Sequence, residues 1–191
     1  MNKMTKDEKV RVLGVVGSPR RGGNTEALVD EVLRGAEEAG GHAEKAVLSE
    51  MNVQPCRACD VCRHACECMI QDDMAALIEQ MRDSRVWVLG TPVYWWGPTA
   101  QMKAFIDRWY GLDRALFRGR DVVLVIPSGG GPSYARLTVE MLESIVPYLG
   151  MKHIRTLQAP GSSGPGSVRR DTALMKRAWS TGHEAVKGLR G

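Results

Sequence analysis

Short apolar runs alternate with amphipathic stretches along almost the whole chain, and this alternation strongly limits the folds that the chain can adopt. The runs are continuous rather than alternating in hydrophobicity, which is typical of strands buried on both faces. They are residues 10–16, 43–49, 86–90, 121–127 and 152–158. Between them, apolar residues recur every three or four positions, as on the buried face of a helix. The expected helices are residues 24–39, 72–82, 99–110 and 133–149, with a last one over 168–187.

Five strands that alternate with five helices predict an α/β fold, a doubly wound parallel sheet with right-handed crossovers. Individual residues indicate where helices begin and end. Asp72 and Thr99 are expected to cap the helices that follow them. Pro147 is expected to kink or break its helix, because proline lacks the amide donor and clashes with the preceding turn. Gly150 is expected to stop the same helix.

Composition fits one soluble domain over residues 1–191, since 43% of the residues are hydrophobic and 25% are charged. The charged start MNKMTKDEKV and the short apolar run behind it predict neither a signal peptide nor a membrane span. We therefore expect a cytoplasmic protein without a membrane partner. The net charge of +4 comes from scattered basic residues, a pattern that does not indicate a nucleic-acid partner.

The first strand leads into a glycine-rich turn, GSPRRGGNTEAL, at residues 17–28. Backbone amides at the helix start that follows form a ready anion site. The turn lacks the dinucleotide fingerprint, and Gly23 and Asn24 stand where a nucleotide P-loop needs lysine and Ser/Thr, so nucleoside triphosphates are disfavoured. The remaining donors suit a single terminal phosphate. They are Ser18, Arg20, Asn24 and Thr25. The alternative is a glycine-rich turn with an exposed arginine pair.

Three segments together resemble the FMN-binding loops of the NADPH-dependent FMN reductase branch of flavodoxin-like proteins. They are GSPRRGGNT, TPVYWWGPTAQMKAFIDR and PSGGG, which follow the first, third and fourth expected strands. The resemblance runs from about residue 10 to about residue 150. It implies a flavodoxin-like three-layer sandwich, a five-stranded parallel sheet of order 2-1-3-4-5 with helices on both faces. The three loops would then meet at the topological switch point of the sheet.

The resemblance also implies which residues bind FMN. Ser18, Arg20, Asn24 and Thr25 would hold its phosphate. The residues that would border the isoalloxazine ring are Pro92, Val93, Tyr94, Trp95, Trp96 and Gly97, with Ser128, Gly129 and Gly130 at its other edge. Glycine amides can approach a flat ring closely because no side chain intervenes. The three aromatic residues have an alternative role as core or interface side chains.

All five cysteines lie in one stretch, CRACDVCRHACEC, within an expected loop at residues 55–71. Thiols stay reduced in the cytoplasm, so this cluster indicates a metal or redox site rather than structural disulfides. Cys56, Cys59 and Cys62 supply three thiolates for a cubane iron-sulfur cluster, and Cys66 or Cys68 supplies a fourth. Zinc binding and a C-x-x-C redox pair are alternatives. His64 is expected to be exposed rather than a ligand.

The spacing C-x2-C-x2-C-x5-C resembles the compact motif of archaeal and bacterial iron-sulfur flavoproteins. This resemblance implies a 4Fe-4S cluster on Cys56, Cys59, Cys62 and Cys68, and it leaves Cys66 as a spare thiol. The additional cysteine departs from the four-cysteine pattern of that family.

These features favour a redox flavoprotein that moves electrons between NAD(P)H or a carrier, FMN and the cluster. The alternatives are an NAD(P)H-dependent FMN or quinone reductase without a cluster, and a pure electron carrier. No acid-base residue is needed for hydride transfer to a flavin. The partner is expected to be a small-molecule or redox-protein electron donor or acceptor. The apolar loop at residues 94–97 also predicts a homodimer or homotetramer, since relatives cover such loops with a second subunit.

Overall fold

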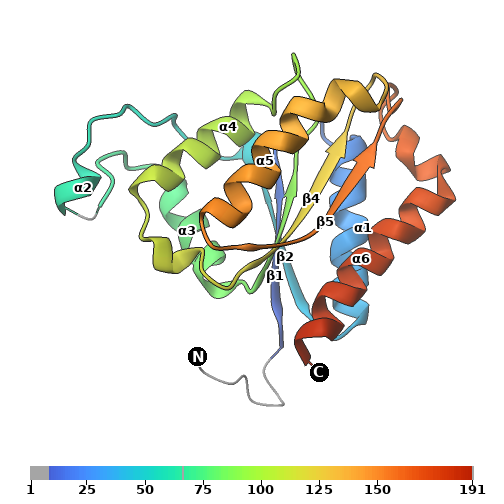
Figure 1. Ribbon diagram of the computed structural model, residues 1–191, viewed down its shortest axis with the longest axis horizontal. Helices are drawn as coiled ribbons and strands as arrows, with labels where there is room; N and C mark the ends of the chain where they lie inside the picture. The colour runs from blue at the N-terminus through green and yellow to red at the C-terminus, as the bar shows by residue number, and fades with distance from the viewer. Residues whose placement is uncertain (1–8, 66, 191) are drawn as a thin grey trace.

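A five-stranded parallel sheet of order β2-β1-β3-β4-β5 forms the middle layer of the computed structural model (Figure 1), which describes residues 9–65 and 67–190. The strands are β1 Arg11–Val16, β2 His42–Val47, β3 Val86–Gly90, β4 Asp121–Pro127 and β5 Lys152–Ala159. Every neighbouring pair runs parallel, in register apart from an irregularity between Val122 and Val123. The predicted α/β class and strand order are confirmed.

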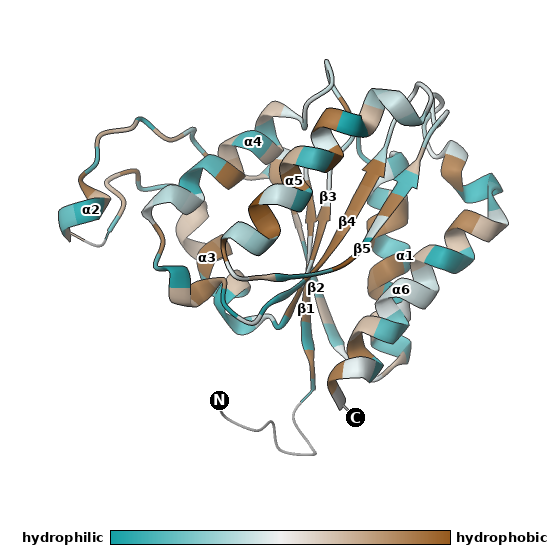
Figure 2. Ribbon diagram, viewed as in Figure 1, coloured by the Kyte–Doolittle hydropathy of each residue, from teal (hydrophilic) through white to brown (hydrophobic). Residues whose placement is uncertain are grey.

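Helices cover both faces of the sheet (Figure 1). On one face lie α1 Asn24–Glu38 and α6 Thr172–Arg190. On the other lie α3 Met74–Asp83, α4 Ala100–Asp107 and α5 Arg136–Tyr148. Side chains of β1 alternate between two cores, with Leu13 and Val15 in one and Val12 and Val16 in the other. Figure 2 shows β4 as mainly hydrophobic, and all of its residues are buried, as expected for a strand covered on both faces.

Several shorter helices complete the described residues. A one-turn helix, α2 Cys62–Ala65, lies within the cysteine-rich loop and was not predicted. Five 3-10 helices are η1 Leu48–Glu50, η2 Arg108–Gly111, η3 Arg114–Leu116, η4 Pro132–Ala135 and η5 Ser167–Arg170. In the part of the chain that the structure describes, no helix is both long and apolar enough to span a membrane.

Two glycines let the backbones of helices α1 and α6 come into direct contact. A Cβ atom placed on Gly182 would lie 1.8 Å from the carbonyl oxygen of Val32, and one on Gly35 would lie 2.0 Å from that of Trp179. Nonbonded atoms cannot come so close, so any side chain at either position would push the helices apart. The outer layer on this face therefore depends on two positions where only hydrogen fits.

Helix ends agree with the sequence in part. Thr99 accepts a hydrogen bond from the N–H of Met102, as predicted for a cap, and Asp72 accepts one from Met74, although the helix begins only at residue 74. The expected break at Pro147 was wrong, because α5 continues to Tyr148. Proline lies in the last turn, where its missing amide removes only one helical hydrogen bond.

The helix α5 then ends as predicted at Gly150. This glycine has a φ of +83°, and its N–H donates to Pro147 while that of Met151 donates to Val146. This pairing is a Schellman motif, which satisfies the last carbonyl groups of a helix. The last predicted helix, 168–187, was displaced: residues 167–170 form the 3-10 helix η5, and α6 starts at Thr172.

Candidate functional site

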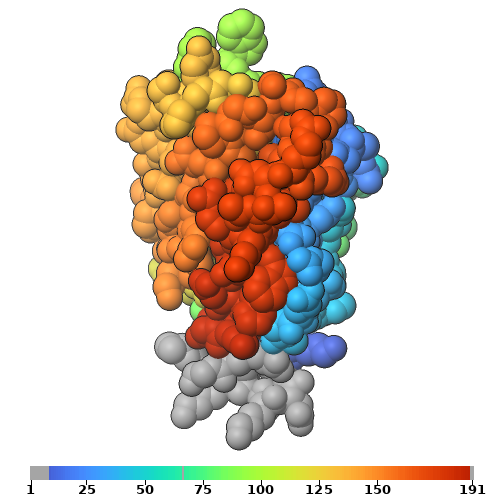
Figure 3. Space-filling view, turned by 90° about the vertical axis from the view of Figure 1, so that its right-hand side faces the viewer, coloured from blue at the N-terminus to red at the C-terminus, as the bar shows by residue number. Residues whose placement is uncertain are grey.

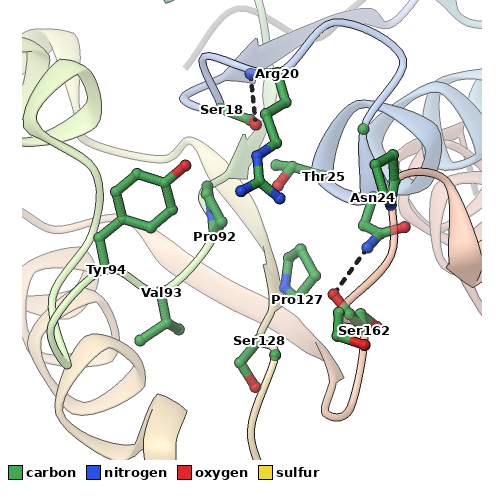
Figure 4. A pocket seen from close by; sticks show the side chains of 14 residues that line it. Ser18, Arg20, Asn24, Thr25, Pro92, Val93, Tyr94, Pro127, Ser128 and Ser162 are labelled. Atoms are coloured by element: carbon green, nitrogen blue, oxygen red, sulfur yellow. Dashed lines mark hydrogen bonds between the residues drawn. The ribbon is translucent and has the colours of Figure 1, made fainter.

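A pocket of about 270 Å³ opens at the carboxyl edge of the sheet, where the loops after β1, β3, β4 and β5 meet (Figure 4). Parallel strands all end at this edge, which brings loops from distant parts of the sequence together. The lining residues are Ser18, Arg20, Gly23, Asn24, Thr25, Pro92, Val93, Tyr94, Pro127, Ser128, Gly129, Ser162, Ser163 and Pro165. Nine of the thirteen residues predicted from the sequence are therefore in one pocket. Trp95, Trp96, Gly97 and Gly130 are outside its lining.

The β1 loop places several hydrogen-bond donors at one end of this pocket. Helix α1 begins at Asn24 behind Gly23, and the N–H groups of a first helical turn have no partner within the helix. Ser18 is buried beside them, and its hydroxyl accepts a hydrogen bond of 3.2 Å from the N–H of Arg20. Figure 4 shows the Arg20 guanidinium group extending over the pocket towards Pro92 and Thr25. A cation, a hydroxyl group and a helix N-terminus are the donors that a phosphate monoester needs.

Glu26 holds the glycine-rich turn in shape. Its carboxylate is almost fully buried and accepts hydrogen bonds of 2.7 Å from the N–H of Gly22 and 2.9 Å from Lys45. Burial acts to raise the pKa of Glu26, but the hydrogen bonds from Lys45 and Gly22, with the charges of Lys45 and Arg21, lower it below its ordinary value. The carboxylate therefore stays charged, and its neighbouring cations offset the repulsion that it would exert on a nearby anion.

Asn24 is turned towards a neighbouring loop. Its side-chain N–H₂ donates to the carbonyl oxygens of Ser162, at 2.9 Å, and Gly164, at 2.8 Å. Its side-chain oxygen accepts from the N–H of Val168 at 3.2 Å. The side-chain amide, predicted as a phosphate contact, thus fastens the loop after β5 to the start of α1. Figure 4 shows the bond to Ser162 along one wall of the pocket.

This β5 loop is the part of the pocket that sequence reasoning missed. It contributes Ser162, Ser163 and Pro165 to the lining. The N–H of Ser162 also donates to the carbonyl oxygen of Ser128, so the β4 and β5 loops are joined. A signal existed, because the hydroxyl-rich segment APGSSGPGS directly follows a predicted parallel strand and must leave from the same edge as the other three loops.

Threonines brace the β3 loop against the β1 loop. Thr91 accepts a hydrogen bond of 3.1 Å from the N–H of Thr99, which closes the loop. Thr99 in turn donates its hydroxyl hydrogen to the carbonyl oxygen of Gly17 at 2.5 Å. Both threonines are fully buried. Pro92, Val93 and Tyr94 are thereby held along the pocket, next to the glycine-rich turn.

The tip of the same loop is a two-residue hairpin. Tyr94 and Gly97 exchange backbone hydrogen bonds of 2.9 and 3.0 Å, and Trp95 and Trp96 between them have φ angles of +50° and +62°. Such left-handed conformations are common for glycine and asparagine in hairpins and costly for bulky residues. The two tryptophans therefore occupy a strained turn, which Figure 3 shows projecting from the surface at the top (green).

Both tryptophans lie outside the pocket and are solvent-exposed in the single chain. Trp95 is 92% exposed, and Trp96 stacks on Tyr134 with ring centroids 6.2 Å apart and planes inclined by 10°. Thr138 donates a hydrogen bond of 2.9 Å to the carbonyl oxygen of Trp96. The resulting aromatic patch consists of Tyr94, Trp95, Trp96, Tyr134 and Leu137, all at least 42% exposed. Apolar surface of this kind marks binding sites more often than free surface.

The β4 loop forms the remaining side of the pocket. Ser128 and Gly129 line it, whereas Gly130 packs against the ring of Tyr134. A Cβ atom on Gly130 would lie 2.6 Å from that ring, so a side chain there would displace Tyr134 and with it the support of Trp96. Gly130 thus connects the pocket to the aromatic patch without lining the pocket.

The cysteine-rich loop extends from one side of the domain, beyond the far end of α4 (Figure 1). Cys56, Cys59, Cys62 and Cys68 all line one small cavity of about 20 Å³, and Cys66 lies outside the described residues. His64 is exposed, as predicted. Four thiols around one cavity are the donor set that an iron-sulfur cluster or zinc takes.

The described conformation of this loop is not a closed metal site. Among residues 9–65 and 67–190, no three His, Cys, Asp or Glu side chains lie close enough together to hold a metal ion. The four thiols around the cavity have the chemistry that a four-thiolate metal group needs. The loop would have to contract to bring them within bonding distance of such a group. The cysteine cavity and the pocket at the carboxyl edge share no lining residue.

Known proteins resemble the chain in sequence and in structure. The sequence profile of the NADPH-dependent FMN reductase family matches residues 10–165. An iron-sulfur flavoprotein of Archaeoglobus fulgidus is 36% identical over 148 residues, which cover 73% of this chain and 75% of the relative. One of Methanosarcina thermophila is 36% identical over 122 residues, covering 64% of each chain, so this match spans less than two thirds of the relative.

Solved structures share the fold at low sequence identity. A flavone reductase superposes with a TM-score of 0.74 at 18% identity, over 94% of this chain and 63% of that one. The NAD(P)H:quinone oxidoreductase of Methanothermobacter marburgensis also gives 0.74, at 17% identity, over 93% of this chain and 97% of that one. These similarities support the α/β arrangement described above.

Proposed function

The chain belongs to the NADPH-dependent FMN reductase family of flavin-dependent redox proteins, and on this premise we propose that it binds FMN and moves electrons from NAD(P)H or a carrier to an acceptor. The observation that carries the proposal is the convergence of the β1, β3 and β4 loops on one pocket, with donors suited to an anion at one end. FMN, unlike FAD or riboflavin, ends in the phosphate monoester that such an end would bind.

The side chains of the pocket have separate roles in this proposal. Ser18, Arg20 and Thr25, with the first N–H groups of α1, hold the phosphate group. Asn24 contributes through its backbone and by fastening the β5 loop. Pro92, Val93 and Tyr94 border one edge of the flavin ring, and Ser128 and Gly129 border the other. Ser162 and Ser163 of the β5 loop offer further hydrogen-bonding groups in the pocket wall.

Bound FMN would supply the chemistry, accepting a hydride and releasing electrons singly or in pairs. The protein residues bind the phosphate, orient the ring and exclude water along its apolar edge. No protein side chain has to donate or remove a proton for hydride uptake. NAD(P)H would approach from the open side of the pocket, and the acceptor is a small molecule or a redox protein.

We also propose that the cysteine-rich loop holds a 4Fe-4S cluster through Cys56, Cys59, Cys62 and Cys68. The grounds are the donor chemistry of four thiols around one cavity and the name iron-sulfur flavoprotein carried by relatives. A competing proposal is an FMN or quinone reductase without a cluster. The open conformation of the loop favours that alternative, since no three ligating side chains of the described residues are close together.

The aromatic patch supports an assembly of two or four copies. Its strained and exposed tryptophans are better explained by burial against another chain than by exposure to water. We propose a homodimer or homotetramer in which this patch is covered. Trp95, Trp96 and Gly97 would then border the flavin site from outside the pocket of one chain.

Anaerobic purification followed by flavin, iron and sulfide analysis tests the cofactor set. NADPH-dependent loss of the oxidised-flavin absorption tests the enzymatic role, and its absence would leave an electron carrier. Serine at Cys56, Cys59, Cys62 or Cys68 should deplete iron while retaining FMN, and serine at Cys66 should leave iron largely in place. Wild type that contains FMN but takes up no iron after reconstitution would leave the reductase without a cluster.

A further inference from the structure

The cysteine-rich loop is closed at its base by a short neck. At one end, Asn52 and Asp73 are joined by two hydrogen bonds, since the N–H of each donates to an oxygen of the other, at 2.7 and 3.1 Å. One step further in, the N–H of Gln54 donates to the carboxylate of Asp72 at 2.8 Å. The loop thus leaves and rejoins the domain at adjacent points, with all the cysteines between them.

Arg108 fills the centre of this neck. It is the first residue of η2, and its side chain is 3% exposed, that of Asp72 only 1%. Its guanidinium group donates to Asp72 at 2.6 Å and to the carbonyl oxygen of Gln54 at 3.0 Å. A longer bond of 3.3 Å goes to the carbonyl oxygen of Ile70. One side chain therefore holds both ends of the loop, each two residues from a cysteine, Cys56 or Cys68.

Asp72 stabilises the positive charge of the buried Arg108. Burial acts to lower the pKa of Arg108, but the hydrogen bond and charge of Asp72 raise it above the ordinary value, with a contribution from Cys68. The guanidinium group is thus paired with Asp72, and it lines the same small cavity as Cys68. Hydrogen-bond donors near the sulfur ligands are one means by which a protein tunes an iron-sulfur site.

The other end of η2 contacts the middle of the loop. A Cβ atom placed on Gly111 would lie 2.9 Å from Sγ and 3.0 Å from Cβ of Cys62, so the sulfur side of α2 packs directly on this glycine. Tyr110 beside it donates a hydrogen bond of 3.0 Å to Asp60, and the guanidinium group of Arg63 lies 5.3 Å from the centre of the Tyr110 ring. The turn therefore contacts the loop at its neck and at Cys62.

We propose that the 3-10 turn Arg108–Gly111 positions the cysteines for metal binding, with Arg108 closing the neck and Gly111 leaving room for Cys62. The proposal rests on the proposed metal-binding role of the loop. Arg108 and Gly111 are positioning residues in this arrangement, because neither is a ligand. The loop must contract to bring its thiols together, and the turn would hold it at two points during that change. Arg108 holds the neck next to Cys56 and Cys68, and Gly111 holds Cys62.

Two variants test the turn while keeping a positive charge opposite Asp72. Arg108→Lys keeps a positive charge for Asp72 but lacks the planar fork that reaches Gln54 and Ile70 together. Gly111→Ala adds one methyl group beside Cys62 at a position whose φ is not left-handed. Arg114→Gln is the matched control, since it removes an exposed arginine from the neighbouring 3-10 helix η3.

The measurement uses Co²⁺ as a probe, added anaerobically to the reduced, FMN-loaded full chain with chelator competition. Thiolate-bound Co²⁺ absorbs at wavelengths longer than oxidised flavin does, so the bands report coordination directly. We expect Arg108→Lys and Gly111→Ala to weaken Co²⁺ binding by about tenfold or more, the range found for outer-shell changes. Arg114→Gln should change it less than about twofold, well below that range. FMN content and the melting temperature establish that each variant is folded.

The outcomes separate this proposal from the one on which it rests. Wild-type affinity and spectra in both folded variants would overturn the positioning role and leave the metal site standing. Wild type that binds no Co²⁺ and forms no cluster would instead overturn the metal-binding role of the loop. If Gly111→Ala weakened Co²⁺ binding while Arg108→Lys bound Co²⁺ as tightly as wild type, the role assigned to Arg108 would be contradicted.

Discussion

Thr99 donates its hydroxyl hydrogen to the backbone oxygen of Gly17 across 2.5 Å, although the two residues are far apart in the sequence. This bond joins the loop after β3 to the glycine-rich turn after β1. The same hydroxyl oxygen caps α4 by accepting from Met102 at 3.2 Å. The end of the pocket that would bind phosphate and the edge that would border the flavin ring are thus fixed to each other by one buried side chain.

Arg20→Ala should weaken FMN binding by about 1.5–3 kcal/mol, the range for a lost hydrogen bond to a charged group. Riboflavin, which has no phosphate, should bind wild type and variant alike. Arg21→Ala is the matched control, because Arg21 lies outside the pocket lining and pairs with Glu26 and Glu50. Flavin fluorescence titration measures all the affinities. Equal affinity of wild type for riboflavin and FMN would contradict a phosphate site in this turn.

Asn24→Ala should loosen the loop after β5, because its side chain makes hydrogen bonds to Ser162, Gly164 and Val168. We expect faster amide hydrogen exchange in residues 160–168 and a loss of about 1–3 kcal/mol in the free energy of unfolding. Ser167→Ala, which removes only a contact of 3.4 Å, should have little effect. Unchanged exchange in the loop would argue against its fastening by Asn24.

Glu26→Gln should lower the free energy of unfolding by roughly 1–3 kcal/mol at neutral pH, since a charged hydrogen bond to Lys45 is lost. The folded-state pKa of Glu26 is lowered from its ordinary value of 4.5, so its stabilisation is present above that value and is lost as pH falls through the folded pKa. The difference between wild type and variant should therefore be constant from neutral pH down to about pH 5 and shrink below it.

Urea unfolding at several pH values checks this dependence. Glu37→Gln, which changes an exposed carboxylate of the same helix, serves as the control and should show no such difference. A wild-type advantage that grows as pH falls would contradict a lowered folded-state pKa for Glu26.

Gly182→Ala should destabilise the chain by about 1–3 kcal/mol, the usual range for overpacking. The added methyl group would meet the backbone of Val32, which cannot rotate away as a side chain can. Gly188→Ala on the same helix has open space around it and should be neutral or slightly stabilising, because alanine favours helices. Denaturant unfolding of the two variants compares them directly, and equal effects would mean that α1 and α6 are not held by close contact.

Trp95→Asn should weaken association between copies without lowering the stability of the chain. Asparagine tolerates the left-handed φ of this position better than tryptophan does, and Trp95 is 92% exposed in the single chain. Sedimentation should show wild type as a dimer or tetramer and the variant shifted towards monomer. Tyr148→Ser, at an exposed aromatic residue of α5, is the control. A flavin-loaded wild-type monomer at micromolar concentration would be incompatible with the proposed assembly.

The sequence predicted the sheet because buried parallel strands have little freedom in composition. Apart from Asp121, the runs at residues 86–90 and 121–127 are apolar because helices cover both faces of β3 and β4. The pocket followed from topology, since loops after parallel strands share one edge. Topology thus brought together the loops that contain Ser18, Arg20, Thr25, Pro92 and Ser128, while the choice of Pro92 and Ser128 came from the resemblance to FMN-binding loops.

Side-chain directions could not be predicted in the same way. The amide of Asn24 suits a phosphate or a carbonyl group equally well, and its choice depends on the position of a loop far along the sequence. Trp95 and Trp96 carry no glycine or asparagine signal for the hairpin that they form. The helix-breaking chemistry of Pro147 has a cost that depends on its distance from the helix end, and the sequence does not fix that distance.

Helix α4 fixes the distance and the orientation between the pocket at the carboxyl edge and the cysteine-rich loop. It is capped by Thr99, which is bonded to the glycine-rich turn, and is followed by Arg108, which closes the neck of the cysteine loop. Each residue of an α-helix adds about 1.5 Å of length and about 100° of rotation. Deleting a single residue from this helix would therefore leave both ends chemically intact while aiming the cysteines in another direction around the helix axis.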